Sequence, residues 1–155
     1  MQFETKEDIE GPIADIFAAI TDFDTFERSA IRRGVEVQRH GTADNALTDL
    51  SWDVTFVFRG TERKMKLDVA ESEPPNAIAL VATGSGMVGD MKVELLALSP
   101  RRTRMTVQCN LTPKTLAARL LVQSLKLARS KLNRKFRLRV AEFARATEER
   151  LGVSV

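Results

Sequence analysis

Histidine, cysteine and tyrosine, which often perform catalysis or hold metal ions, are almost absent from this sequence. His40 is the only histidine, Cys109 is the only cysteine, and there is no tyrosine. A single histidine without a cluster of cysteines or carboxylates makes a poor metal site. A nucleophilic cysteine needs a neighbouring base, and none is evident near Cys109. We therefore name no catalytic residue and expect no metal and no cofactor.

A glycine-rich stretch, GSGMVG at residues 84–89, matches the pattern of dinucleotide-binding loops. In those proteins the loop opens a helix, whose N-terminus meets the pyrophosphate. Here the stretch leads into DMKVELLALS, in which apolar and polar residues alternate as they do in a strand. The glycines are better explained by a turn between two antiparallel strands, and we do not expect nucleotide binding.

The remaining reactive side chains have structural explanations. Asp22 and Asp24 lie between two short predicted helices, where carboxylates cap helix ends. His40 follows a short strand and precedes Gly41, which places it at a surface loop. Cys109 falls on the apolar side of its strand, so we expect a buried and unreactive thiol.

Alternating apolar and polar residues predict a sheet with one apolar face. Residues 2–9 form the first predicted strand. Two short helices follow, one starting at Pro12 and one over about 22–31. The other predicted strands, six in number, cover residues 34–40, 51–60, 63–71, 77–84, 91–99 and 104–111.

The last element is predicted to be one helix over about 116–150, capped by Thr115 and about 50 Å long. It is the only element large enough to cover the apolar face of the sheet. One line along it carries the apolar residues Leu121, Leu125, Ala128, Leu132, Phe136 and Phe143. Arg139 falls on the same line. It either anchors the acidic head of a ligand, extends to solvent, or pairs with an acid of the N-terminal half.

Charge is strongly segregated along the chain. Residues 1–94 hold 10 basic and 18 acidic side chains, whereas residues 95–155 hold 14 basic and 3 acidic ones. We expect the acidic part of the protein to balance the basic helix. Phe136 and Phe143 belong to the buried line, which leaves no exposed stacking platform, so nucleic acid is not an expected partner. Leu120, Leu127 and Leu138 lie on the outer side among basic residues, which keeps contact with a membrane surface and homodimerisation open.

The opening IEGPIADIFAAITDFDTFERSA, the strand SWDVTFVFRG and the long terminal helix resemble the SRPBCC or START-like superfamily, which includes birch-pollen-allergen-like, polyketide cyclase-like and coenzyme Q-binding proteins. Within the opening, Pro12, Phe17, Ile20 and Asp22 match the family pattern. The resemblance implies an α+β helix-grip fold, in which a curved antiparallel sheet of six or seven strands wraps a long C-terminal helix. Residues 1–155 would form one such domain.

The resemblance also implies an apolar cavity between the sheet and the helix. The inward faces of the predicted strands and helix nominate its lining: Trp52, Val54, Phe56, Phe58, Met65, Leu67, Met91, Val93, Met105, Val107, Leu125, Leu132, Phe136 and Arg139. The other reading of the same pattern is that these side chains fill the space themselves.

We expect a non-catalytic binding or carrier module for a small hydrophobic or amphipathic ligand, such as a lipid, a quinone or a polyketide-like compound. The alternatives are a polyketide cyclase-like enzyme and a peripheral membrane or partner-docking protein that uses the basic helix. The predicted inward faces carry almost no polar group except the indole of Trp52, which favours binding over catalysis. The acidic N-terminus does not read as a signal peptide, and a cytoplasmic location is expected.

Overall fold

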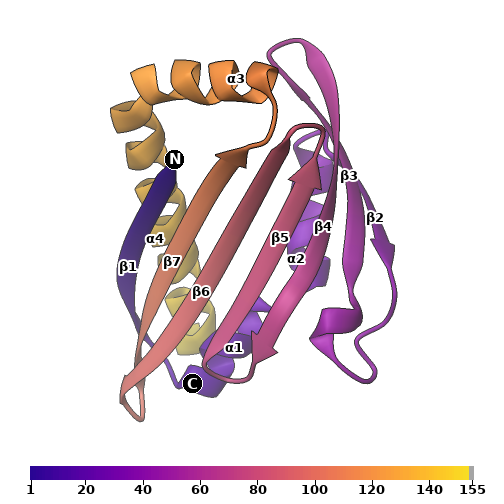
Figure 1. The fold of residues 1–155 in the computed structure, drawn as a ribbon. Coiled ribbons are helices and arrows are strands. Elements are labelled where there is room, and N and C mark those ends of the chain that lie inside the picture. The colour runs from indigo at the N-terminus through magenta and orange to yellow at the C-terminus, as the bar shows by residue number, and fades with distance from the viewer. Residues whose placement is uncertain (154–155) are drawn as a thin grey trace.

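The computed structural model describes residues 1–153, whose strands form one seven-stranded antiparallel sheet (Figure 1). The strand order across the sheet is β1–β7–β6–β5–β4–β3–β2. The strands are β1 (Gln2–Glu10), β2 (Glu36–His40), β3 (Ser51–Phe58), β4 (Thr61–Glu73), β5 (Ala77–Gly84), β6 (Met87–Ser99) and β7 (Arg102–Pro113). The expected α+β helix-grip architecture is therefore confirmed.

Helices cover one face and one end of this sheet. They are α1 (Ile13–Ile20), α2 (Phe23–Arg32), the short 3-10 helix η1 (Leu47–Asp49), α3 (Leu116–Leu127) and α4 (Arg129–Val153). Because β1 and β2 are the two edge strands, α1 and α2 carry the chain from one edge of the sheet to the other. Along the covered face, α4 packs on β1 and α2 on β2.

The strand register explains the alternation seen in the sequence. Met91 lies opposite Cys109, Val93 opposite Val107, and Leu95 opposite Met105, so apolar pairs follow one another along β6 and β7. The glycine-rich stretch is the β5–β6 hairpin, as expected, and its last three residues already belong to β6. The helix N-terminus that a dinucleotide loop needs does not occur at this point of the chain.

The prediction of one continuous C-terminal helix is wrong. α3 ends at Leu127, and α4 begins at Arg129 and runs in a different direction (Figure 1). The backbone N–H of Ala128 closes α3 on the carbonyl of Leu125, and the carbonyl of Ala128 accepts from the N–H of Leu132 in α4. The bend lets α3 pack on β7 at the end of the sheet while α4 follows the covered face.

Both helix caps expected from the sequence are present. The hydroxyl of Thr115 accepts from the N–H of Ala118 at 3.2 Å and caps α3. Asp22 caps α2 through the N–H of Thr25. No helix within residues 1–153 is both long enough and apolar enough to cross a membrane.

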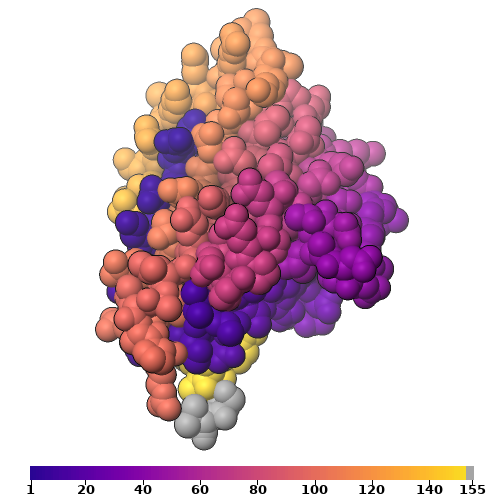
Figure 2. All heavy atoms as spheres, turned by 60° about the horizontal axis from the view of Figure 1, so that its bottom comes forward, coloured from indigo at the N-terminus to yellow at the C-terminus, as the bar shows by residue number. Residues whose placement is uncertain are grey.

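α1 closes one end of the molecule. Ile16, Phe17 and Ile20 are buried on its inner side. Figure 2 shows α1 between the β6–β7 turn and the loop that precedes β3, with the end of α4 alongside. Below α1, the buried hydroxyl of Thr103 in β7 donates to the carbonyl of Gly11 at 2.9 Å, which joins the β1–α1 turn to the sheet.

We predict that Thr103→Val lowers the free energy of unfolding by about 1–3 kcal/mol, because the buried Gly11 carbonyl loses its hydroxyl donor. Urea unfolding followed by circular dichroism measures the change. The control is Thr83→Val in β5, which is exposed and is expected to change stability by less than about 0.5 kcal/mol. Equal stability of the two variants would contradict the role given to Thr103.

Candidate functional site

A cavity of about 480 Å³ lies between the sheet and helices α2 and α4. This volume is in the range of about 300–1,000 Å³ that small-molecule sites occupy. The lining side chains are mainly apolar and come from α1, α2, the strands of the sheet and α4, together with Val35 before β2. They are Ile20, Phe23, Phe26, Glu27, Ala30, Val35, Val37, Trp52, Val54, Met65, Leu67, Leu80, Met91, Val93, Met105, Val107, Phe136, Arg139, Val140 and Phe143.

Aromatic rings from three elements surround this space. The ring of Phe23 in α2 packs edge-on against Trp52 in β3, with centroids 5.0 Å apart. Phe26 in α2 stacks on Phe143 in α4 with centroids 5.7 Å apart, so the two helices touch across the cavity. Since Phe26 is exposed, this stack lies where the cavity meets solvent.

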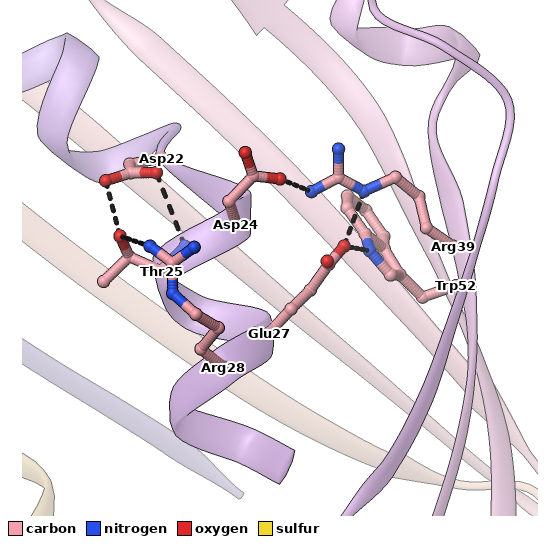
Figure 3. A network of polar contacts seen from close by, with 7 residues as sticks. All are labelled: Asp22, Asp24, Thr25, Glu27, Arg28, Arg39 and Trp52. Carbon is pink, nitrogen blue, oxygen red and sulfur yellow. Dashed lines mark hydrogen bonds and ion pairs between the residues drawn. The ribbon is translucent and has the colours of Figure 1, made fainter. Parts of the chain in front are cut away.

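The carboxylate of Glu27 is the centre of a polar network at one side of the cavity (Figure 3). Its Oε1 accepts from the indole Nε1 of Trp52 at 2.6 Å and from Nε of Arg39 at 2.5 Å. Nη2 of Arg39 also donates to Asp24 at 2.7 Å. The bond to Glu27 holds the pKa of Arg39 above its ordinary value. α2 is thereby tied to β2 and β3 through one carboxylate.

A second set of polar contacts fixes the start of α2 (Figure 3). The hydroxyl of Thr25 donates to Oδ2 of Asp22 at 2.7 Å, and Arg28 donates to the same hydroxyl. The hydrogen bond from the Thr25 side chain is the main reason why the pKa of Asp22 lies below its ordinary value. Asp22 therefore acts as the expected cap, whereas Asp24 pairs with Arg39.

Arg139 is the other charged residue of the lining. It projects from α4 on the same side as Phe136 and Phe143, which are one turn away in either direction. Its side chain is exposed, and within residues 1–153 it makes no ion pair and no hydrogen bond. Of the three alternatives left open by the sequence, pairing with an acid of the N-terminal half does not occur within residues 1–153, and extension to solvent agrees with the exposed side chain.

Most of the residues nominated from the sequence meet at the cavity. Those that line it are Trp52, Val54, Met65, Leu67, Met91, Val93, Met105, Val107, Phe136 and Arg139. Phe56, Phe58, Leu125 and Leu132 are half-buried but are not part of the lining. Phe56 packs on the core, and Phe58 lies under the guanidinium groups of Arg59 and Arg63.

Leu125 and Leu132 are absent from the lining for the same reason. Leu125 and Leu132 flank the bend at Ala128, so they lie where the chain turns toward the end of the sheet. A straight helix would have carried both of them along the covered face.

The sequence reasoning missed the contribution of α2 and of the segment after it. Phe23, Phe26, Glu27, Ala30, Val35 and Val37 line the cavity, as do Ile20, Leu80, Val140 and Phe143. The spacing of Phe23, Phe26, Glu27 and Ala30 was an available signal, because residues three and four apart share one face of a helix. No local signal singled out Glu27, since its two donors lie on strands far along the chain.

His40 and Cys109 lie outside the lining. His40 is exposed at the end of β2, where Nε2 is 2.7 Å from Oδ2 of Asp53. Cys109 is half-buried against the core. Desolvation, with a smaller effect of Asp90, raises the pKa of its thiol to about 11. Within residues 1–153 no group of three histidine, cysteine or carboxylate side chains is arranged to hold a metal ion.

We predict that Cys109 in the folded protein reacts with iodoacetamide at pH 8 at least about 100-fold more slowly than in the unfolded chain, because a thiol with this pKa is almost entirely protonated. Intact-mass spectrometry follows the reaction directly, since no other cysteine is present. The same reaction in guanidinium chloride is the control. Native and unfolded rates within about tenfold of each other would contradict the buried, inert thiol.

The basic helices make no ion pairs with the acidic part of the protein. The ion pairs of residues 1–153 join β1 to β7, connect β2 to α2 and β3, and link neighbours within β4 and β6. None involves a lysine or arginine of α3 or α4. Besides the hydrogen bond from Thr25, the charge of Arg150 in α4 nevertheless contributes to the lowered pKa of Asp22, so part of the expected balance is present. The outward Lys126, Lys131, Arg134 and Arg137 are exposed as predicted.

Comparison with known proteins identifies the fold. No family model and no curated protein matches the chain. A protein from Thermus thermophilus shares 13% identity with a TM-score of 0.65, and the match covers 99% of each chain. Truncated norcoclaurine synthase from Thalictrum flavum shares 10% identity over 97% of this chain and 92% of its own, with a TM-score of 0.66.

The aromatase/cyclase from a Streptomyces species is similar to the same degree, with 12% identity, a TM-score of 0.63, and coverage of 97% of this chain and 95% of its own. At these identities the likeness concerns the fold. The chain therefore has the helix-grip fold that the resemblance drawn from the sequence implied.

Proposed function

We propose that this protein is a binding or carrier module for a small hydrophobic or amphipathic molecule, held between the sheet and helices α2 and α4. The observation that carries the proposal is the cavity of about 480 Å³, whose lining is apolar except for Glu27, Arg139 and the indole N–H of Trp52. Three methionines in the lining, Met65, Met91 and Met105, suit ligands of irregular shape, because methionine adapts its conformation easily. The free thiol of Cys109 fits a reducing compartment such as the cytoplasm.

Binding is favoured over the aromatase or cyclase chemistry after which one protein of the same fold is named. Within the described chain, Glu27 is the one carboxylate of the lining, and Arg39 and Trp52 already donate to it. A general acid or base must reach the proton that it transfers, and Glu27 is held toward the sheet edge by those two donors. The network is better suited to holding α2 in place than to moving protons.

Trp52 allows the proposal to be tested directly, because it is the only tryptophan and it lines the cavity. We predict saturable quenching of its fluorescence by N-phenyl-1-naphthylamine, a neutral apolar dye, with energy transfer to the bound dye. Val54→Phe fills part of the cavity and is expected to weaken binding at least about tenfold.

The matched control is Val57→Phe on the same strand, whose side chain points away from the cavity and is exposed. This variant is expected to bind within about twofold of the wild type. Circular dichroism and thermal unfolding verify that both variants are folded. Lack of dye binding by the wild type, or equal binding by both variants, would overturn the proposal.

A second candidate function, peripheral contact with an anionic membrane, is favoured by the outer face of α3. Leu116, Leu120 and Leu127 are exposed there, Leu127 to 92%. They share one side of the helix, while Arg119 and Lys126 lie beside them. The sequence predicts Leu120, Leu127 and Leu138 on one outer side. The bend at Ala128 separates Leu138 from the other two, and Leu116 joins them instead. α3 lies across one end of the molecule, next to the β3–β4 hairpin (Figure 1), from which Arg59 donates to the hydroxyl of Ser124.

Charge complementarity favours an anionic lipid surface as the partner of the outer face of α3. No Asp or Glu occurs between residues 95 and 141, and none of the close ion pairs of residues 1–153 involves a basic side chain of α3 or α4. Each lysine or arginine near an anionic bilayer contributes about 1 kcal/mol, which salt screens. An amphipathic helix lying flat on the surface would add the burial of its leucines.

We predict that the protein sediments with vesicles of phosphatidylcholine and phosphatidylglycerol at low salt, and much less at high salt or with phosphatidylcholine alone. Replacing Leu120 and Leu127 by Gln is expected to lower the affinity at least about tenfold. The control replaces Leu96 and Leu98 by Gln, which are exposed in β6 near the opposite end of the molecule. Salt-independent binding, equal effects of both pairs, or a dimer in sedimentation velocity that the first pair abolishes would count against a membrane surface.

A further inference from the structure

The two charged residues that line the cavity, Glu27 and Arg139, differ in whether protein groups already satisfy their hydrogen-bonding capacity. Glu27 accepts from Trp52 and from Arg39, at 2.6 and 2.5 Å. Arg39 in turn bridges Glu27 and Asp24. The negative charge at this side of the cavity is therefore already bound by protein donors.

Arg139 has no such partner. Within residues 1–153 it makes no ion pair, and this includes Glu142, the first acid on α4, only three residues further on. Lys135 and Arg137, which precede Arg139 by four and two residues on the same helix, are also basic, so the local charge is positive. A guanidinium group at the edge of an apolar space can donate to two oxygens of one anion at once.

The position of Arg139 decides which part of a ligand it would meet. Phe136, Val140 and Phe143, its neighbours on α4, face the cavity, while the Arg139 side chain is exposed to solvent. A ligand whose apolar body lay on these rings and on Met65 or Leu67 would place its polar end beside Arg139. An amphipathic molecule with one anionic end matches this arrangement better than a wholly apolar molecule or a cation.

We infer that the ligand class of this cavity is a carboxylic acid with an apolar body, with its carboxylate on Arg139. This inference rests on the proposed binding function and narrows it. Arg139 is a binding residue here, and Glu27 positions α2 and the Trp52 indole. A single guanidinium group favours a single negative charge, which a carboxylate supplies.

The test compares three probes of the same chain length: decanoate, decanol and decyltrimethylammonium. Affinities for the wild type are measured by quenching of Trp52 and by isothermal titration calorimetry, below the concentrations at which the probes form micelles. We predict that decanoate binds about tenfold more tightly than decanol, as one charge-assisted hydrogen bond implies. The cationic probe is expected to bind most weakly.

Two variants test whether Arg139 is responsible for the preference for decanoate. Arg139→Gln is expected to abolish the preference, so that decanoate and decanol bind this variant with similar affinities. Arg137→Gln removes an equal charge from an exposed position on α4 outside the lining, and should keep the preference for decanoate. Both positions are exposed, so neither change is expected to impair folding.

The outcomes separate this inference from the proposed function. Binding of decanol without preference for decanoate, a preference that survives Arg139→Gln, or tightest binding of the cation would overturn the carboxylate inference and leave the binding function standing. Failure of all three probes to bind would overturn both.

Discussion

The width of the sheet is the constraint on which the rest of this structure depends. Seven strands spaced about 4.8 Å apart span about 29 Å, whereas one helix with its side chains is about 10–12 Å across. α4 packs mainly on β1 and α2 on β2, while α1 contacts β6 and β7 near one end of the sheet. The curvature of the sheet and the Phe26–Phe143 contact between α2 and α4 then enclose space over the middle strands. A cavity is thus the direct result of covering a wide, one-sided sheet with two helices at its flanks.

Much of the sheet could be predicted from the sequence, because in a strand with one apolar face every second residue is apolar. The alternation alone places Trp52, Val54, Met65 and Leu67 on the apolar face, while the cavity over that face was implied by the family resemblance. The bend at Ala128 could not be seen in the same way. The apolar positions of α3 and α4 follow one another at helical spacing through the break, so the hydrophobic pattern is that of a continuous helix. The bend coincides with the packing of α3 on β7, a feature of tertiary structure.

Glu27 illustrates a different limit of prediction from sequence. In an amphipathic helix a glutamate next to Arg28 is indistinguishable from the many that are solvated. Its importance comes from the Trp52 indole and the Arg39 guanidinium, which reach it only after β2 and β3 have paired. Such a residue joins elements that are separate in sequence, and its partners are fixed by the topology. Arg139 was noticed for the opposite reason, since a charge within an apolar line is visible before folding.

The bend at Ala128 also has a consequence for how this protein can change over evolutionary time. Of the two helices that it separates, α4 contributes side chains to the cavity and α3 contributes none. Substitutions on the outer side of α3 can therefore change the exposed surface at this end of the molecule without reshaping its interior. Substitutions along α4 can alter the interior without changing that end of the molecule. In one uninterrupted helix, the surface at this end and the cavity lining would belong to a single rigid element. Here they belong to two helices and can change independently.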